Sequence, residues 1–128
     1  MADWDSYRDG ARKRGALGWE LFVVHSVPTA PPEEVQAVLP DHLAYQSQLE
    51  EAGTLVMAGP VSDETGTRAD GMGMMIYRAA SLEEATRIAR ADPMHARGAR
   101  SFAIRKWLVN EGALSVNLRL SAQAVSLG

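Results

Sequence analysis

The chain has 128 residues, of which 46% are hydrophobic and 23% charged, a composition typical of one globular domain rather than of a disordered segment. Its 13 basic and 16 acidic side chains give a net charge of −3, which argues against a nucleic-acid partner and against attraction to anionic membranes. The absence of Cys excludes disulfides, thiolate catalysis and Cys-based metal centres, and it suits a reducing compartment.

The 18 N-terminal residues are polar and interrupted by glycines, so we expect them to form a short helical or loose arm outside the core. This arm contains no apolar stretch that would serve as the core of a signal peptide. Elsewhere the sequence has no run of about 20 apolar residues, the length that a membrane-spanning helix needs. The expected location is therefore cytoplasmic, with no membrane partner.

From residue 19 onward the pattern predicts the order strand, helix, strand, strand, helix, strand. The first strand covers residues 19–27 (WELFVVHSV), which are rich in β-branched and aromatic side chains. Apolar residues at steps of three and four then predict a long helix that Pro32 opens and Gly53 ends. Pro40 lies inside this stretch and leaves two alternatives, a kinked helix or two helices with the second beginning near Pro40.

Two short strands follow over residues 54–59 and 71–78, and a polar hairpin loop over residues 60–70 joins them. The segment 81–84 (SLEE) matches a capping box, so a second helix is predicted to begin there. Pro93 is expected to stop this helix, because proline disfavours helical backbone at the residue before it.

Residues 101–110 (SFAIRKWLVN) alternate in side-chain type as a half-buried strand does. Beyond them, residues 113–120 alternate again and predict either a further edge strand or a tail that exchanges with a partner chain. We therefore expect a core domain over residues 19–112, preceded by the arm over residues 1–18 and followed by a C-terminal extension over residues 113–128.

Two strand–helix–strand units joined by a hairpin place both helices on one face of an antiparallel sheet, because each crossover is right-handed. The predicted fold class is α+β, with a ferredoxin-like βαββαβ arrangement. The first strand is apolar at both alternating sets of positions, as in Leu21 to Val24, so its second face also needs a cover. We expect a second copy of the chain to supply it, which gives a homodimeric α+β barrel.

Two polar residues, His42 and Asp92, fall on the apolar stripes of the two helices. A buried carboxylate is costly unless another group pairs with it, and antiparallel helices are predicted to bring these two side chains together. A carboxylate bonded to one imidazole nitrogen fixes the tautomer and leaves the other nitrogen to act as general acid or base near neutral pH. Two structural alternatives stay open: a core His42 bonded to backbone, and an Asp92 held by the turn before Pro93.

Six basic residues and one acidic residue lie between positions 87 and 106. Most of the basic residues are expected to form a solvated face. The sharper hypothesis is that one or two of these basic residues, together with His95, hold an anionic substrate near the pair, and Arg105 is the preferred candidate because it sits on a strand. His95, His42 and Asp92 lack the spacing of a metal site and no phosphate-binding glycine motif occurs, so neither a metal nor a cofactor is expected.

The segments HLAYQSQLEEAGTLVMAGPVSD, SLEEATRIARADPMHARGARSF and IRKW closely resemble the YCII-related (YciI-like) proteins, over about residues 19–112. The resemblance implies a dimeric α+β barrel of ferredoxin-like units, with an active-site pair that falls on His42 and Asp92. It also places the family's AGP motif on residues 58–60, with Asp63 as a nearby acid that we expect at the substrate. Most members of the family have no assigned activity, and a few resemble lyases or dehydrochlorinases acting on small cyclic compounds.

The favoured hypothesis is a cofactor-independent, lyase-like enzyme in which His42, oriented by Asp92, moves a proton on a small anionic metabolite in an elimination or isomerisation. An alternative is a non-catalytic dimer that binds a small molecule or serves as an accessory module, in which the pair only satisfies buried polar groups. A third is a purely structural dimer. The sequence leaves the choice between enzyme and binding module open.

Overall fold

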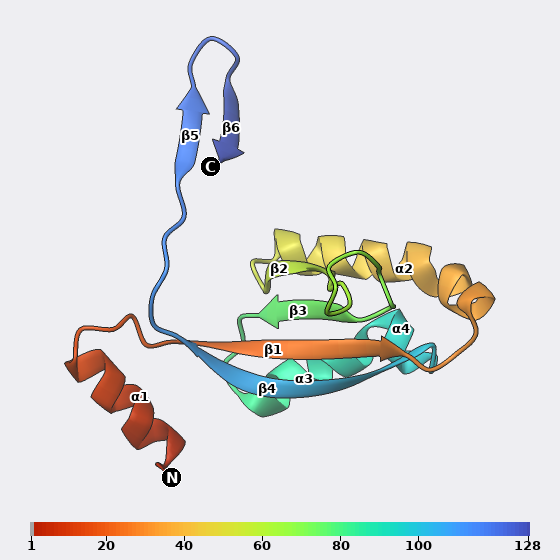
Figure 1. Ribbon diagram of the computed structural model, residues 1–128, viewed down its shortest axis with the longest axis horizontal. Helices are drawn as coiled ribbons and strands as arrows, with labels where there is room; N and C mark the ends of the chain where they lie inside the picture. The colour runs from red at the N-terminus through yellow and green to blue at the C-terminus, as the bar shows by residue number, and fades with distance from the viewer. Residues whose placement is uncertain (1) are drawn as a thin grey trace. The chain divides into compact units, whose positions relative to one another are not determined.

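The computed structural model describes residues 2–128 and divides them into two compact units. The larger unit covers Glu20–Trp107, and the segments before and after it form the smaller one. The elements of the larger unit, in chain order, are β1 (Trp19–Pro28), α2 (Pro32–Glu51), β2 (Leu55–Pro60), β3 (Gly73–Tyr77), α3 (Leu82–Ala91), α4 (Pro93–Ala96) and β4 (Arg100–Val109) (Figure 1). Across the described chain, none of the helices has the length and hydrophobicity that a membrane span requires.

The strands of the larger unit form one four-stranded sheet in the order β2-β3-β1-β4. Strand β3 pairs antiparallel with both β1 and β2, so β1 and β2 run parallel and need the crossover that α2 provides. Helix α3 passes behind β4 in Figure 1, so the viewer looks at the face of the sheet opposite α3. The predicted α+β, ferredoxin-like fold is confirmed.

Helix α2 runs without interruption from Pro32 to Glu51 and contains Pro40, so the alternative of two separate helices is wrong. Pro32 fits the first helical position because its fixed φ suits the helix and an N–H there would lack an intrahelical partner. Pro40 removes one backbone bond, and the tertiary packing of inward residues such as Val38 offsets that loss. Gly53 follows the helix at a φ of 78°, a left-handed conformation that glycine adopts without strain.

The capping box opens α3 as predicted, with Ser81 Oγ accepting a hydrogen bond from the Glu84 N–H. The Glu84 carboxylate accepts from the N–H of Ala80 rather than from that of Ser81. The helix ends before Asp92, which has a non-helical backbone because Pro93 follows it. This break between α3 and α4 places the Asp92 side chain at the first turn of α4.

The core lies between the sheet and α3 and is built from the strand residues that alternate inward. Its fully buried members are Phe22, Val24, Met75, Tyr77, Ala85 and Ala89. Phe102 and Ile104 of β4 pack against this cluster, whereas Arg105 is exposed and Trp107 keeps 43% of its surface accessible. The predicted alternation of this strand is confirmed. Burying each of the larger apolar side chains stabilises the fold by about 1.5–3 kcal/mol.

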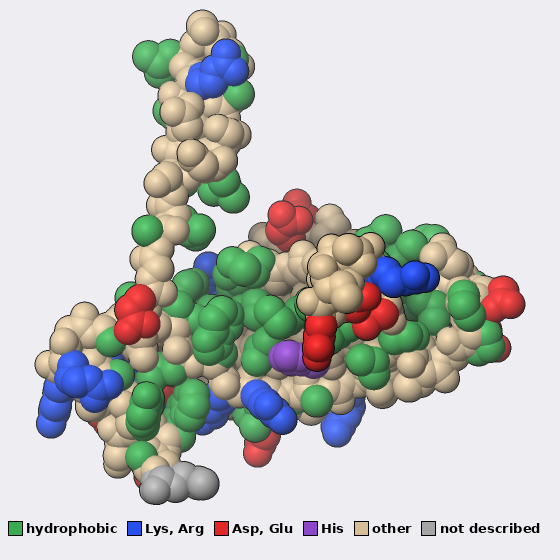
Figure 2. Space-filling model, in the orientation of Figure 1, with side chains coloured by type: hydrophobic (Ala, Val, Ile, Leu, Met, Phe, Trp, Pro, Cys, Tyr) green, Lys and Arg blue, Asp and Glu red, His purple; other side chains and the backbone are tan. Residues whose placement is uncertain are grey.

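The opposite face of the sheet carries the alternate side chains of the same strands. Leu21 and Ile76 on this face are buried, whereas Met57, which pairs across the strands with Ile76, is 54% exposed. Figure 2 shows this face in the orientation of Figure 1, with hydrophobic side chains gathered over the strands. The face opposite the helices therefore keeps apolar surface in contact with solvent.

The regular elements of the smaller unit are α1 (Trp4–Lys13), β5 (Val116–Arg119) and β6 (Ala124–Leu127). Among the strands described, β5 pairs with β6 and not with the four-stranded sheet, so the predicted further edge strand of that sheet is not found. The register places Val116 opposite Leu127 and Leu118 opposite Val125, so these four apolar side chains share one face of the hairpin.

Candidate active site

His42 and Asp92, 50 positions apart in the chain, meet where α2 passes the junction of α3 and α4. Nδ1 of His42 lies 2.9 Å from Oδ1 and 2.8 Å from Oδ2 of the Asp92 carboxylate. The carboxylate is fully buried, whereas the His42 side chain is 18% exposed. An ionised carboxylate only accepts hydrogen bonds, so Nδ1 carries the proton and Nε2 is the nitrogen left for another partner.

The Asp92 carboxylate is held by backbone as well as by His42. Its Oδ1 accepts a hydrogen bond from the Met94 N–H at 2.9 Å, which makes Asp92 the N-cap of α4. Burial, reinforced by the negative charge of Asp92, raises the pKa of the Tyr45 hydroxyl. That hydroxyl donates to the Ile88 carbonyl at 2.7 Å and ties α2 to α3. Helices α2 and α3 are thus held together close to the pair.

His42 lines a cavity of about 500 Å³, together with residues of α2, the AGP motif at the end of β2 and the start of β3. Apolar residues of the wall include Val35, Leu39, Leu43, Met72, Met74 and Met94. The polar side chains of the wall are Ser26, Gln36, His42, Gln46 and Arg100. No described residue makes a hydrogen bond with Nε2 of His42. An apolar cavity of this size with a few polar groups is typical of a small-molecule site.

A second histidine, His95, is hydrogen-bonded at both ring nitrogens. Nδ1 lies 2.6 Å from the Ala89 carbonyl oxygen, and Nε2 lies 2.8 Å from Oγ of Ser26. A carbonyl only accepts, so Nδ1 donates to Ala89 and Nε2 accepts from the Ser26 hydroxyl. Burial lowers the pKa of His95, although the Ala89 carbonyl and the charge of Asp92 oppose the shift. His95 lines another hollow, of about 650 Å³, and is not part of the wall beside His42.

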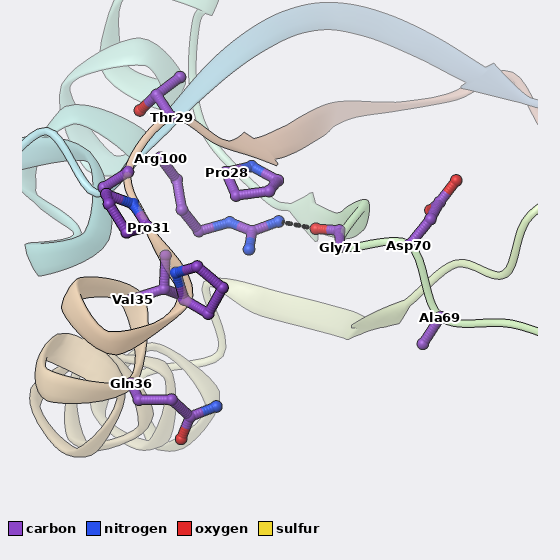
Figure 3. A pocket seen from close by; sticks show the side chains of 11 residues that line it. Pro28, Thr29, Pro31, Val35, Gln36, Ala69, Asp70, Gly71 and Arg100 are labelled. Carbon is purple, nitrogen blue, oxygen red and sulfur yellow. Dashed lines mark hydrogen bonds between the residues drawn. The ribbon is translucent and has the colours of Figure 1, made fainter.

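Arg100, the first residue of β4, extends this second network to the loop before β3. Its Nε donates to Ser26 Oγ at 2.9 Å, and its Nη2 donates to the Ser26 carbonyl at 2.8 Å and to the Gly71 carbonyl. Figure 3 shows the guanidinium extending across a hollow toward Gly71. Gly71 has a φ of 99°, and a Cβ there would lie 2.9 Å from Cγ of Pro28, so glycine is required for this approach.

The sequence pattern singles out neither Ser26 nor Arg100 as a site residue. Arg100 shares the alternate positions of β4 with Phe102 and Ile104, which pack on the core. Ser26 likewise follows Val24 by two positions and is buried. Because side chains two apart on a strand share a face, this alternation is the signal that identifies both as inward residues.

The other predicted substrate-binding residues do not line the cavity beside His42. Arg105 is exposed on the face of the sheet opposite the core. Asp63 lies in the loop after β2, where the Thr65 hydroxyl donates to it at 2.6 Å and lowers its pKa. The structure brings His42 and Asp92 together. His95 lies close to the pair, since its backbone N–H donates to the Asp92 carbonyl at 2.9 Å, but it does not line this cavity. The role of His95, Arg105 and Asp63 in substrate binding stays a prediction.

His42 and Asp92 are two side chains of the kind that bind metal ions. Within the described part of the chain, however, no group of three or more His, Cys, Asp or Glu side chains lies close enough together to hold one.

Comparison with known proteins places the chain among its relatives. YjpA, an uncharacterized protein of Bacillus subtilis (strain 168), is 38% identical over 66 residues, which cover 52% of this chain and 71% of that protein. The structure of 5-chloro-2-hydroxyhydroquinone dehydrochlorinase (TftG) from Burkholderia phenoliruptrix AC1100, in complex with 2,5-dihydroxybenzoquinone, is similar with a TM-score of 0.52 at 23% identity, covering 68% of this chain and 92% of that one. This likeness shows a shared fold. The model of the YCII-related domain matches residues 20–108, which is most of the chain, and the protein therefore belongs to the YCII-related domain family.

Proposed function

We propose that the protein is a cofactor-independent enzyme that uses His42 as general base and acid on a small molecule, in an elimination or isomerisation. One observation carries the proposal: Nδ1 of His42 is paired with the buried Asp92 carboxylate, and His42 lines a cavity of about 500 Å³. Nε2, which no described residue contacts by a hydrogen bond, is the nitrogen available for proton transfer. Asp92 acts as the positioning residue, since it holds the tautomer that leaves the Nε2 lone pair free.

The proposed reaction begins with Nε2 taking a proton from a substrate carbon. The electrons of the broken C–H bond form a new double bond, and the imidazolium is stabilised by the adjacent Asp92 carboxylate. In an elimination, the leaving group departs from the neighbouring carbon with its bonding electrons. In an isomerisation, Nε2 returns the proton to another atom of the same molecule. Both reactions need one base and balance without an oxidant or reductant.

The structural comparison supports this class of reaction. TftG is named a dehydrochlorinase, and the loss of hydrogen chloride is an elimination. Its structure contains 2,5-dihydroxybenzoquinone, a small cyclic molecule of a size that a cavity of about 500 Å³ admits. At 23% identity the two chains share a fold, so the activity is transferred to this protein only as part of the proposal.

The test uses 5-chloro-2-hydroxyhydroquinone and a panel of small carbonyl compounds with an acidic C–H bond, each incubated with the protein in deuterated buffer. Chloride release reports elimination, and deuterium incorporation seen by NMR reports proton abstraction. We expect His42→Gln to lower the rate by about 10²–10⁴-fold with the circular dichroism spectrum unchanged. Asp92→Asn should lower the rate as well, because the imidazole loses its fixed tautomer.

The matched control is Arg87→Gln, a change at an exposed position of α3, which should keep the full rate. A rate that His42→Gln leaves unchanged would refute the general-base role. Saturable binding without turnover across the whole panel would favour the non-catalytic binding module instead.

We also propose that the protein is a homodimer joined through the face of the sheet opposite the helices. The exposed side chains of Met57 and Trp107 on that face support the proposal, because apolar surface on a sheet is commonly covered by a partner (Figure 2). Sedimentation velocity should show a dimer for the wild type, and Trp107→Asp combined with Met57→Asp should shift it toward the monomer. A wild type that sediments as a monomer would contradict the proposal.

A further inference from the structure

Strand β4 lies at one edge of the four-stranded sheet, and among the described strands it has β1 as a neighbour on one side only. Figure 1 shows β4 as the outermost strand, with α3 behind it. The backbone of a strand directs its N–H and C=O groups alternately to its two sides, so an edge strand leaves one row of these groups without a strand partner. β4 therefore presents backbone donors and acceptors along its free side.

The two edges of the sheet differ in how well they are protected against further strands. β2, at the other edge, has 6 residues, an irregular register between Leu55 and Met57, and Gly59 and Pro60 at its end. Short length, bulges and proline are ordinary means by which proteins prevent strands from adding to a sheet. β4 has 10 residues and contains neither glycine nor proline. It is therefore the edge of this sheet that can accept another strand.

A hollow of about 650 Å³, which we call the β4 groove, lies beside this edge. Its lining includes Arg90 of α3 and four residues of β4, namely Arg100, Ser101, Phe102 and Ile104. Neighbouring residues of a strand point to opposite faces of the sheet, so a hollow that both Ser101 and Phe102 line reaches the edge between the two faces. Extended peptides add to exposed sheet edges, and pockets beside the edge give them specificity.

The charges around the β4 groove favour an acidic partner. Arg90 and Arg100 line the groove, and none of its lining residues is acidic. Arg105 and Lys106 add two further basic residues to β4, which has no acidic residue. A second copy of β4 would place a basic strand against a basic strand, and like charges across a strand pair are destabilising. A strand that carries acidic side chains is complementary in charge.

We propose that the free edge of β4 binds an extended acidic peptide segment of another protein, which adds to the sheet as a further strand. The backbone of this segment pairs with residues 100–104. Its side chains on the α3 side lie against Phe102 and Ile104, so apolar residues suit those positions. Neither His42 nor Asp92 lines the β4 groove, so the inference stands independently of the proposed function.

The test compares three capped pentapeptides by isothermal titration calorimetry. The acidic peptide has the sequence Glu-Val-Glu-Val-Glu, the basic peptide has Lys in place of each Glu, and the interrupted peptide is Glu-Val-Glu-Pro-Glu. Proline keeps the charge of the acidic peptide but removes a backbone donor and disfavours pairing within a sheet. We expect the acidic peptide to bind at least about tenfold more tightly than either of the others.

Charge-reversal variants locate the binding site. Arg90→Glu and Arg105→Glu should each weaken binding of the acidic peptide by about three- to tenfold, because each places a like charge beside the added strand. Arg68→Glu is the matched control, since it makes the same charge change at an exposed position of the loop between β2 and β3. It should leave the affinity unchanged. Equal weakening by all three variants would show a general effect of charge and overturn the proposal.

Hydrogen exchange followed by NMR tests the added strand itself. Without peptide, every second backbone amide of residues 100–104 should exchange rapidly, and the acidic peptide should protect these amides. Inorganic polyphosphate carries negative charge without a peptide backbone and should not protect them. Three results would overturn the proposal: no binding of the acidic peptide, protection by polyphosphate, or amides that are all protected before any peptide is added. The last result would mean that a second copy of the chain already covers the edge.

Discussion

Two histidine networks in the larger unit use the same side chain in opposite ways. His42 gives one ring nitrogen to Asp92 and keeps the other unbonded at a cavity wall, whereas both nitrogens of His95 are engaged by Ala89 and Ser26. Both rings are partly buried. Burial therefore does not distinguish a candidate general base from a structural histidine. The feature that distinguishes the candidate general base is a ring nitrogen without a hydrogen bond in a residue that lines a cavity.

The two rings also differ in the charge of their neighbours: a negative group lies beside His42 and a positive group is linked to His95. The partner of His42 is a carboxylate, which stabilises an imidazolium. His95 is linked through Ser26 to the guanidinium of Arg100, and that positive charge adds to burial in lowering the pKa of His95. The network around His95 thus suits a ring that stays neutral.

The largest expected effect separates the two rings by activity. His42→Ala should lower the rate of deuterium incorporation into an active probe by about 10²–10⁴-fold, and added imidazole should restore part of it, because the base is lost and a space is left. His95→Ala should keep most of the activity and should not respond to imidazole. If imidazole restored the activity of His95→Ala and not that of His42→Ala, His95 and not His42 would be the general base.

The second effect concerns stability at the carboxylate. Asp92→Ala should lower the free energy of unfolding by about 2–4 kcal/mol, because it removes a charge-assisted bond to His42 and the cap of α4. Asp92→Asn keeps an acceptor oxygen, so it should lower the free energy of unfolding by clearly less than Asp92→Ala does. Urea unfolding measures both variants. A loss below about 0.5 kcal/mol for Asp92→Ala, the size of an ordinary surface change, would contradict the buried pairing.

The third effect concerns the centre of the other network. Ser26 is 2% exposed and bonds to both His95 and Arg100, so Ser26→Ala should cost about 1–3 kcal/mol by leaving two groups without their partner. Ser101→Ala, at an exposed position of β4, is the control and should change little. Equal stability of the two variants in urea unfolding would mean that the network does not support the fold.

The smallest effect is a pH dependence. The pKa of His95 lies below its ordinary value of 6.5 in the folded state, so near and below that pH the unfolded chain binds a proton more readily than the folded chain. The stability that depends on a neutral His95 is fully present above the ordinary value and is lost as the pH falls toward the folded one. The difference in unfolding free energy between the wild type and His95→Gln should therefore shrink on acidification. If the difference in unfolding free energy grew on acidification instead, the pKa of His95 would be raised in the folded state rather than lowered.

Three features are predictable from local sequence patterns: the order of the elements in the core domain, the start of α3, and the contact between His42 and Asp92. These features follow from local causes: hydrophobic periodicity, a capping box, a helix stopped by Pro93, and the handedness of crossovers that brings the two helices side by side. The alternation of side-chain type along β4 is also visible in the sequence, and in the structure it separates the inward Arg100 from the outward Arg105.

The hydrogen-bond partners of buried polar groups depend on tertiary packing. Pattern predicts that a side chain points inward, but hydrogen bonds depend on groups that come from distant parts of the chain, as with Ser26, Gly71 and Arg100. The continuity of α2 through Pro40 has the same origin, since packing against other elements outweighs a local preference. The sequence pattern predicts the pair of residues at the candidate site, whereas its cavity forms only when the sheet and its helices have packed.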